Sequence, residues 1–287
     1  MSSALETRHP TIRSADGTQI WAASAGRSAK DAPVIVFVPG FSSSSLTFRK
    51  QFQDESLLAK YCLITYEPRG QGRSGQPLEK AAYSSERNAE DFKAVCETFG
   101  ATKVVLAGWS YGGIIPVDVF AHLGPDWISG IIYLSGLPWR SAHPEIGHPF
   151  AFEALGPLIQ PDAAGIATSL EVVLDSCFYP PNRDTMTYTE HTALAGAIGQ
   201  QHPVARTLLL TARDQDPTKL LDHATTMPVL LIIGEHDRQI LWENVDALLK
   251  RHFVRYEVLL VKDAGHTAFW ERPVETNVAI QAFVDEL

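Results

Sequence analysis

The sequence predicts an α/β fold, in which a largely parallel β-sheet is covered by helices on both faces. The first observation is a set of short, continuously apolar runs, as expected of strands buried on both faces: Val34–Val38, Cys62–Tyr66, Val104–Ala107, Ile131–Leu134, Val229–Ile233 and Val258–Val261. The second is the amphipathic segments between several of these runs, Ser85–Phe99, Leu241–Phe253 and Val274–Leu287. Repeated strand-then-helix units indicate parallel strands joined by crossover helices.

The first two strands are expected to form a hairpin. Two β-prone runs, Thr11–Ser14 and Gln19–Ala25, flank the turn dipeptide Asp16-Gly17. An Asp-Gly pair between two such runs favours a tight hairpin turn. The sequence therefore predicts a hairpin that precedes the six apolar runs.

One interval, residues 139–222, breaks the alternation of strand and helix because it contains no convincing buried strand. An unstructured loop of this length would be exceptional in a compact domain. Four segments have helical patterns: Leu155–Gln160, Gly165–Phe178, Tyr188–Ile198 and Val204–Thr211. We therefore predict a core domain made of residues 1–138 and 223–287, interrupted by a helical insertion at 139–222.

Bulk properties exclude several classes of partner. The 287-residue chain has a formal charge of −9 and no lysine/arginine cluster, which argues against nucleic acid and anionic membranes. No apolar run approaches the ~20 residues that span a bilayer. The three cysteines lack metal-site spacing, and residues 1–10 lack the apolar core of a signal peptide. We expect a cytoplasmic protein with free thiols; the oligomeric state is open, with a homodimer among the options.

The most informative motif is Gly108-Trp109-Ser110-Tyr111-Gly112, which follows one apolar run and precedes a predicted helix. A G-x-S-x-G turn between strand and helix is a nucleophile elbow, which holds its serine at a sharp corner with the hydroxyl exposed. Small residues on both sides are needed because strand and helix nearly touch there. The motif makes Ser110 the candidate nucleophile.

Two further polar residues follow predicted strands directly. Asp237 comes after Val229–Ile233, and His266 comes after Val258–Val261. The carboxyl ends of parallel strands form one edge of the sheet, where functional groups gather. The order Ser110, Asp237, His266 is also the order expected for an elbow of this kind. We therefore expect the three side chains to meet.

Together these residues can perform acyl transfer. A serine hydroxyl becomes a strong nucleophile when an imidazole takes its proton, and a carboxylate fixes the tautomer of that imidazole. We assign Ser110 as nucleophile, His266 as general base and then acid, and Asp237 as the orienting acid. Glu235 and Asp263 are rival carboxylates, but Glu235 lies closer to its strand and Asp263 lies too near His266 in sequence to face its ring.

The tetrahedral intermediate of acyl transfer also needs hydrogen-bond donors for its oxyanion. One is expected to be the backbone N–H of Tyr111, which follows the nucleophile at the start of the next helix. The other is expected from the loop after Val34–Val38, where Gly40 lets the backbone turn its amides inward. We choose the N–H of Phe41.

These residues resemble the α/β-hydrolase superfamily, and in particular its capped serine hydrolases of the esterase and haloperoxidase-like branch. The run Glu67–Ser74 is similar to the family's D-x-R-G-x-G-x-S turn, with a glutamate for the usual aspartate, and His266–Pro273 looks like its histidine loop. The resemblance implies an α/β-hydrolase fold with an eight-stranded sheet and makes residues 139–222 a helical cap that closes the pocket. Expected wall residues are Trp109, Trp139 and Phe269, with Phe150, Phe152 and Tyr179 as further candidates.

A serine at the elbow argues against haloalkane dehalogenases and epoxide hydrolases, which are similar in outline but use aspartate. We expect a hydrolase that cleaves a small, apolar carboxylic ester through an acyl-enzyme on Ser110, without metal or cofactor. Perhydrolase, lactonase and carbon–carbon bond hydrolase chemistry use the same triad and stay open. A slow-turnover ligand-binding receptor of the same fold is the alternative from a different class.

Overall fold

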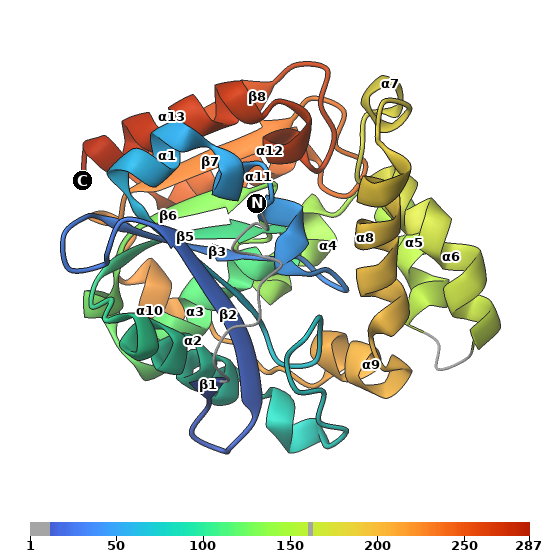
Figure 1. Cartoon of the computed structure of the whole chain (residues 1–287), viewed down its shortest axis with the longest axis horizontal. Coiled ribbons are helices and arrows are strands. Elements are labelled where there is room, and N and C mark those ends of the chain that lie inside the picture. Colours follow the sequence, from blue (N-terminus) through green and yellow to red (C-terminus); the bar gives the residue numbers. More distant parts are fainter. Residues whose placement is uncertain (1–11, 160–162) are drawn as a thin grey trace.

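The computed structural model describes residues 12–159 and 163–287, and it contains an eight-stranded sheet in the order β1-β2-β4-β3-β5-β6-β7-β8 (Figure 1). The strands are β1 (Ile12–Arg13), β2 (Gln19–Gly26), β3 (Val34–Val38), β4 (Cys62–Glu67), β5 (Val104–Trp109), β6 (Ile128–Leu134), β7 (Val229–Gly234) and β8 (Tyr256–Val261). The neighbours from β4 to β8 are parallel, whereas β2 runs antiparallel to both β1 and β4. The predicted fold class is confirmed.

The N-terminal hairpin forms as the sequence indicates, although Thr11 lies outside the described residues. Ile12 pairs with Ile20 across the two strands. The turn depends on Gly17, whose φ of 83° is strained for residues with a side chain, and on Asp16, whose Oδ1 accepts the Thr18 N–H at 3.0 Å.

Helices cover both faces of the sheet and enclose one hydrophobic core on each. One face carries α2 (Ser85–Phe99), α3 (Ile115–His122), α10 (Thr218–Leu221) and α11 (Trp242–His252). The other carries α1 (Glu55–Lys60), α12 (Ala268–Glu271) and α13 (Pro273–Asp285). The helix predicted at 85–99 is correct to the residue because local signals end it: the Ser84 hydroxyl accepts the Arg87 N–H, and Gly100 follows with φ 71°.

Strand β8 departs from the expectation of complete burial. Val258 is 40% exposed, and only Val261 at the end of the strand is fully buried. The reason is its place at the edge of the sheet, next to β7 alone. An apolar run predicts a strand here, but it does not reveal that one face reaches solvent.

Glu67, which replaces the family's aspartate at the end of β4, has a structural role. Its buried carboxylate accepts the backbone N–H and the hydroxyl of Ser45, and it forms an ion pair of 2.6 Å with Arg73. Gly72 fits against it, since a Cβ there would lie 2.2 Å from Glu67 Oε2. These contacts fix the loop beside the carboxyl edge of the sheet.

Most of residues 139–222 form helices beyond the carboxyl edge of the sheet, on the right of Figure 1, whereas α10 lies against one face of the sheet. They comprise α4 (His143–Ile146), α5 (Pro149–Leu158), α6 (Ala163–Ser176), α7 (Pro180–Arg183), α8 (Tyr188–Gln200) and α9 (Pro203–Thr211) before α10 returns to the core. The predicted helices are present, although α5 begins six residues earlier than expected and Gln160 lies outside the described residues. No strand occurs in the described part of this interval.

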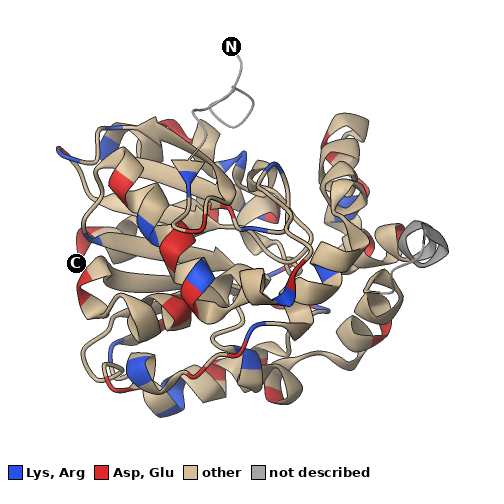
Figure 2. Ribbon diagram, turned by 90° about the horizontal axis from the view of Figure 1, so that it is seen from below, with Lys and Arg blue, Asp and Glu red and all other residues tan. Residues whose placement is uncertain are grey.

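Charged residues are distributed over the outer helices and loops, with basic and acidic positions interspersed in the view of Figure 2. The strands in the same view carry few charged positions, in keeping with their apolar sequences. None of the helices that the structure describes is both long and apolar enough to cross a membrane.

Candidate active site

The segment around Ser110 has the geometry of a strained elbow. Ser110 follows β5 directly and has a φ of 50°, which is uncommon for a residue with a side chain. A Cβ atom at Gly108 would lie 2.6 Å from the carbonyl oxygen of Gly112, and one at Gly112 would lie 2.3 Å from that of Val38. Both positions therefore exclude any side chain, and the close approach turns Ser110 outward.

Asp237 and His266 come together in the loops after β7 and β8. His266 Nδ1 lies 2.8 Å and 3.0 Å from the two carboxylate oxygens of Asp237, and both side chains are buried. The backbone N–H groups of Gln239 and Ile240 also donate to Asp237 Oδ1, at 2.8 Å and 2.9 Å. The carboxylate is thus held in place, and it directs Nε2 of the imidazole away from itself.

The rival carboxylates lie elsewhere. Glu235 has a 43% exposed side chain that faces His236 at 3.8 Å. Asp263 is exposed in a turn with φ 50°. Neither makes a hydrogen bond to His266 among the described contacts, so the geometry favours Asp237 as the partner of the imidazole.

Trp109 joins the elbow to the histidine loop. Its indole Nε1 donates to the carbonyl oxygen of His266 at 2.9 Å, and the two rings lie 5.7 Å apart. Because Ser110 follows Trp109 directly, this hydrogen bond joins the segment that carries the serine to the loop that carries the imidazole. No hydrogen bond joins the two side chains within the described residues, and such bonds often tighten only when substrate binds.

The loop after β3 lies against Ser110. A Cβ at Gly40 would be only 3.0 Å from Ser110 Cβ, and Gln71 Nε2 holds the loop by donating to the Gly40 carbonyl at 3.1 Å. Phe41 follows, and its ring meets that of Tyr111 edge to face at 6.1 Å. The two candidate oxyanion residues thus flank Ser110 and touch each other.

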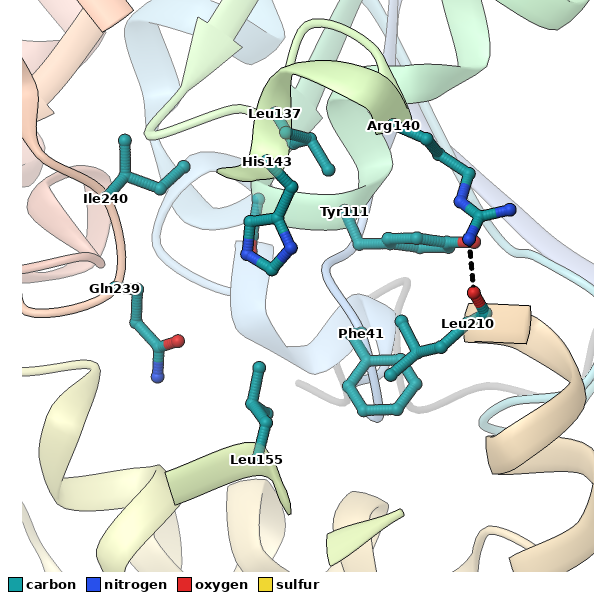
Figure 3. Close-up of a pocket in the computed structure, with 10 residues that line it drawn as sticks. Phe41, Tyr111, Leu137, Arg140, His143, Leu155, Leu210, Gln239 and Ile240 are labelled. Atoms are coloured by element: carbon teal, nitrogen blue, oxygen red, sulfur yellow. Dashed lines mark hydrogen bonds between the residues drawn. The ribbon is translucent and has the colours of Figure 1, made fainter. Parts of the chain in front are cut away.

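A cavity of about 180 Å³ opens beside Ser110 (Figure 3). The space is small, and it suits a small chemical group beside Ser110. Most of the wall is apolar, with a few polar side chains among the lining residues: Phe41, Ser110, Tyr111, Leu137, Arg140, His143, Leu155, Leu210, Gln239 and Ile240.

A smaller apolar cavity of about 40 Å³ lies on the other side of Phe41. Phe41 lines both spaces and therefore separates them. Trp109 belongs to this second wall, together with apolar residues of α6 and α8: Val173, Leu174, Leu194 and Ile198.

The other two expected wall residues do not line either cavity beside Ser110. Trp139 is buried in the core on the face of the sheet that carries α11, and its ring meets that of His252 edge to face with the ring centres 5.5 Å apart. Phe269 is buried between Phe48 and Trp109, with ring distances of 5.4 Å and 5.8 Å. Packing on the sheet takes up both rings.

Sequence reasoning missed the polar part of the cavity. His143 lines it, and burial lowers the pKa of its imidazole, as does the nearby charge of Arg140. Gln239 and Arg140 also face it (Figure 3). Arg140 follows the carboxyl end of β6, and that placement is the signal that could have drawn attention to it.

Tyr111 is fixed by the helical insertion as well as by the elbow. Its hydroxyl donates to the carbonyl oxygen of Leu209 near the end of α9, and the guanidinium of Arg213 lies 5.3 Å from the centre of its ring. Burial raises the pKa of the phenol. Tyr111 therefore links the elbow to α9.

Residues 35–279 match the Alpha/beta hydrolase family, and the chain belongs to this family. A putative aryl esterase from Burkholderia cenocepacia is 28% identical, with a TM-score of 0.82 over 97% of this chain and 98% of its own. A bromoperoxidase from Bacillus anthracis shares the fold at 20% identity, with a TM-score of 0.80 over 96% and 99%. A proline iminopeptidase of Saccharolobus solfataricus is 24% identical over 242 residues, 78% of this chain and 76% of that protein.

Proposed function

We propose that this protein is a serine hydrolase that cleaves a small carboxylic ester through an acyl-enzyme on Ser110. One observation carries the proposal: the buried Asp237–His266 pair, 2.8 Å apart at the closest atoms, is bonded through Trp109 to the elbow that holds Ser110. A carboxylate on Nδ1 fixes the tautomer in which Nε2 can accept a proton.

In the first half-reaction, Ser110 Oγ attacks the ester carbonyl while His266 Nε2 takes its proton. Asp237 stabilises the imidazolium that forms, and the backbone N–H groups of Phe41 and Tyr111 bind the oxyanion. When the tetrahedral intermediate collapses, the C–O bond breaks and His266 returns the proton to the departing alcohol. The acyl group stays on Ser110.

In the second half-reaction, water attacks the acyl-enzyme and gives a proton to His266. Collapse of the second intermediate frees the carboxylic acid and restores the Ser110 hydroxyl. Every proton in the cycle moves through the same imidazole, so both half-reactions depend on His266.

Residues 139–222 are proposed to act as a cap. Their contribution to the wall of the cavity supports this, since His143, Leu155 and Leu210 all come from the insertion and face Ser110 across the space. In this role, the wall would select the substrate by size.

The proposal is tested with a fluorophosphonate probe, which should label Ser110 stoichiometrically. Ser110→Ala should abolish labelling. With p-nitrophenyl esters from acetate to decanoate as substrates, Ser110→Ala and His266→Ala should lower kcat by about 10⁶-fold and Asp237→Asn by about 10⁴-fold. Ser43→Ala is the matched control, since its hydroxyl lies against Thr47 in the smaller cavity and should be dispensable.

Two outcomes would redirect the proposal. Full activity in Asp237→Asn would point to another carboxylate. Labelling of Ser110 with turnover far below about 1 s⁻¹ on every ester would favour a ligand-binding receptor over an enzyme.

A further inference from the structure

The cavity beside Ser110 carries a positive charge and no acidic residue to offset it. Arg140 is the one charged side chain among its lining residues, which otherwise comprise apolar groups, Ser110, Tyr111, His143 and Gln239. Burial and Arg140 both lower the pKa of His143, which favours the neutral form of this imidazole. This cation stands out in a chain with a net charge of −9.

The partners of Arg140 leave its charge largely uncompensated. Nη1 donates to the carbonyl oxygen of Arg213, and Nη2 donates to that of Leu210 (Figure 3). A guanidinium has five N–H donors, and these bonds use two of them. The carbonyls at the end of α9 supply a partial negative charge of about half a unit at most.

The nearby carboxylates are engaged elsewhere. Asp118 is paired with Arg213 at 3.1 Å. Asp237 is paired with His266 at 2.8 Å. Arg140 makes no ion pair within 4.0 Å among the described residues. A buried or half-buried guanidinium is stabilised by a carboxylate, which it binds through two parallel N–H···O bonds.

We propose that Arg140 forms a carboxylate-binding subsite of the cavity, and that the preferred substrate is a short ester whose acyl part carries a free carboxylate. This inference rests on the proposed ester hydrolysis at Ser110. The small volume of the cavity, about 180 Å³, suits a short acyl chain such as that of a dicarboxylic half-ester. The proposed subsite also refines the expectation of an apolar ester, since the apolar wall binds the acyl chain of the substrate and Arg140 binds the carboxylate at its far end.

The test compares two esters that differ only in charge. Monomethyl glutarate carries the carboxylate, and the methyl ester of glutaramic acid carries a neutral amide of the same shape; hydrolysis of both is followed by NMR. The wild-type protein should prefer the anionic ester in kcat/KM. In Arg140→Gln this preference should fall by about 10- to 100-fold, chiefly through KM, because a charge-assisted hydrogen bond to substrate is lost.

Two further variants separate a direct contact from other effects. Arg140→Lys keeps the charge and should retain most of the preference. The guanidinium of Arg238 lies over the Phe150 ring, 4.0 Å from its centre, and Arg238 is not among the residues that line this cavity. Arg238→Gln therefore removes a nearby cation and should leave the preference for the anionic ester unchanged. If Arg140 merely capped α9, Arg140→Gln would slow both esters equally, and this result would overturn the subsite.

Labelling of Ser110 by fluorophosphonate distinguishes a failure of the carboxylate subsite from a failure of the proposed ester hydrolysis. If Ser110 is labelled but the wild-type protein cleaves the anionic ester no better than the amide, or not at all, the carboxylate subsite is refuted and the hydrolase is not. If Ser110 is not labelled and neither ester is cleaved, the proposed function itself fails and the subsite falls with it.

Discussion

The buried ion pair between Arg213 and Asp118 should be the main anchor of the helical insertion on the core. Arg213 follows α9, whereas Asp118 lies in α3 directly after the elbow. Their side chains are 1% and 0% exposed and lie 3.1 Å apart. Asp118 also accepts hydrogen bonds from Ser85 at 2.6 Å and Gln215 at 2.9 Å. Arg213→Met would leave this carboxylate buried without its cation.

Removal of one partner from a buried pair costs about 3–5 kcal/mol of unfolding free energy. At an unfolding entropy of about 2.1 cal/mol/K per residue, a chain of 287 residues has about 0.6 kcal/mol/K in total. Arg213→Met should therefore lower Tm by about 5–8 °C in calorimetry. The matched control is Lys250→Met, which breaks a surface pair with Asp246 and should lower Tm by about 1 °C or less.

The loss should also depend on pH. Burial raises the pKa of Asp118, and Arg213 opposes that rise. Without Arg213 the pKa of Asp118 in the folded state rises further. The folded state therefore takes up a proton on Asp118 more readily than the unfolded state as pH falls. Stability then decreases as pH rises through the folded pKa, and the deficit of Arg213→Met should be larger at pH 8 than at pH 5.

The double variant Arg213→Met/Asp118→Asn should recover much of the loss, because no buried charge is left. Three results would refute the reasoning: a fall in Tm no greater than that of Lys250→Met, a deficit that is independent of pH, or a double variant less stable than Arg213→Met alone.

Other predictions concern the elbow, the divided cavity and the thiols. Gly112→Ala should abolish Ser110 labelling, since its Cβ would lie 2.3 Å from a backbone carbonyl, whereas Gly196→Ala, with nothing within 4 Å, should label normally; equal labelling of both would contradict the close packing. Phe41→Ala should join the two cavities and shift the preference among p-nitrophenyl esters toward longer acyl chains; an unchanged profile would show that the ring does not divide them. Cys177 is buried, and burial raises the pKa of its thiol to about 12, so it should react with Ellman's reagent at pH 8 only after denaturation, and rapid reaction of the native thiol would argue against this.

The sequence predicted the sheet and the candidate triad because the signals for both are local. Apolar runs mark strands with both faces covered, and Ser84 and Gly100 delimit α2 through contacts within one turn of the helix. Gly108 is required by its close approach to the Gly112 backbone within one strand–turn–helix unit, whereas Gly112 is required by the carbonyl of Val38 on the neighbouring strand β3. The strand-end positions of Asp237 and His266 follow from the parallel topology alone, which brings those ends to one edge.

What the sequence could not supply is the outcome of packing between distant segments. Trp139 and Phe269 fit a pocket wall as residue types, but neighbouring core residues enclose both rings. Arg140 and His143 become lining residues only because α5 and α9 return over the elbow and leave a space there. The partial exposure of β8 likewise depends on its place at the sheet edge. Chain order and residue pattern thus determined the elements and the chemistry at their ends, whereas the cavity and its charge were decided by tertiary structure, because a cavity is the volume that side chains from remote elements leave unfilled.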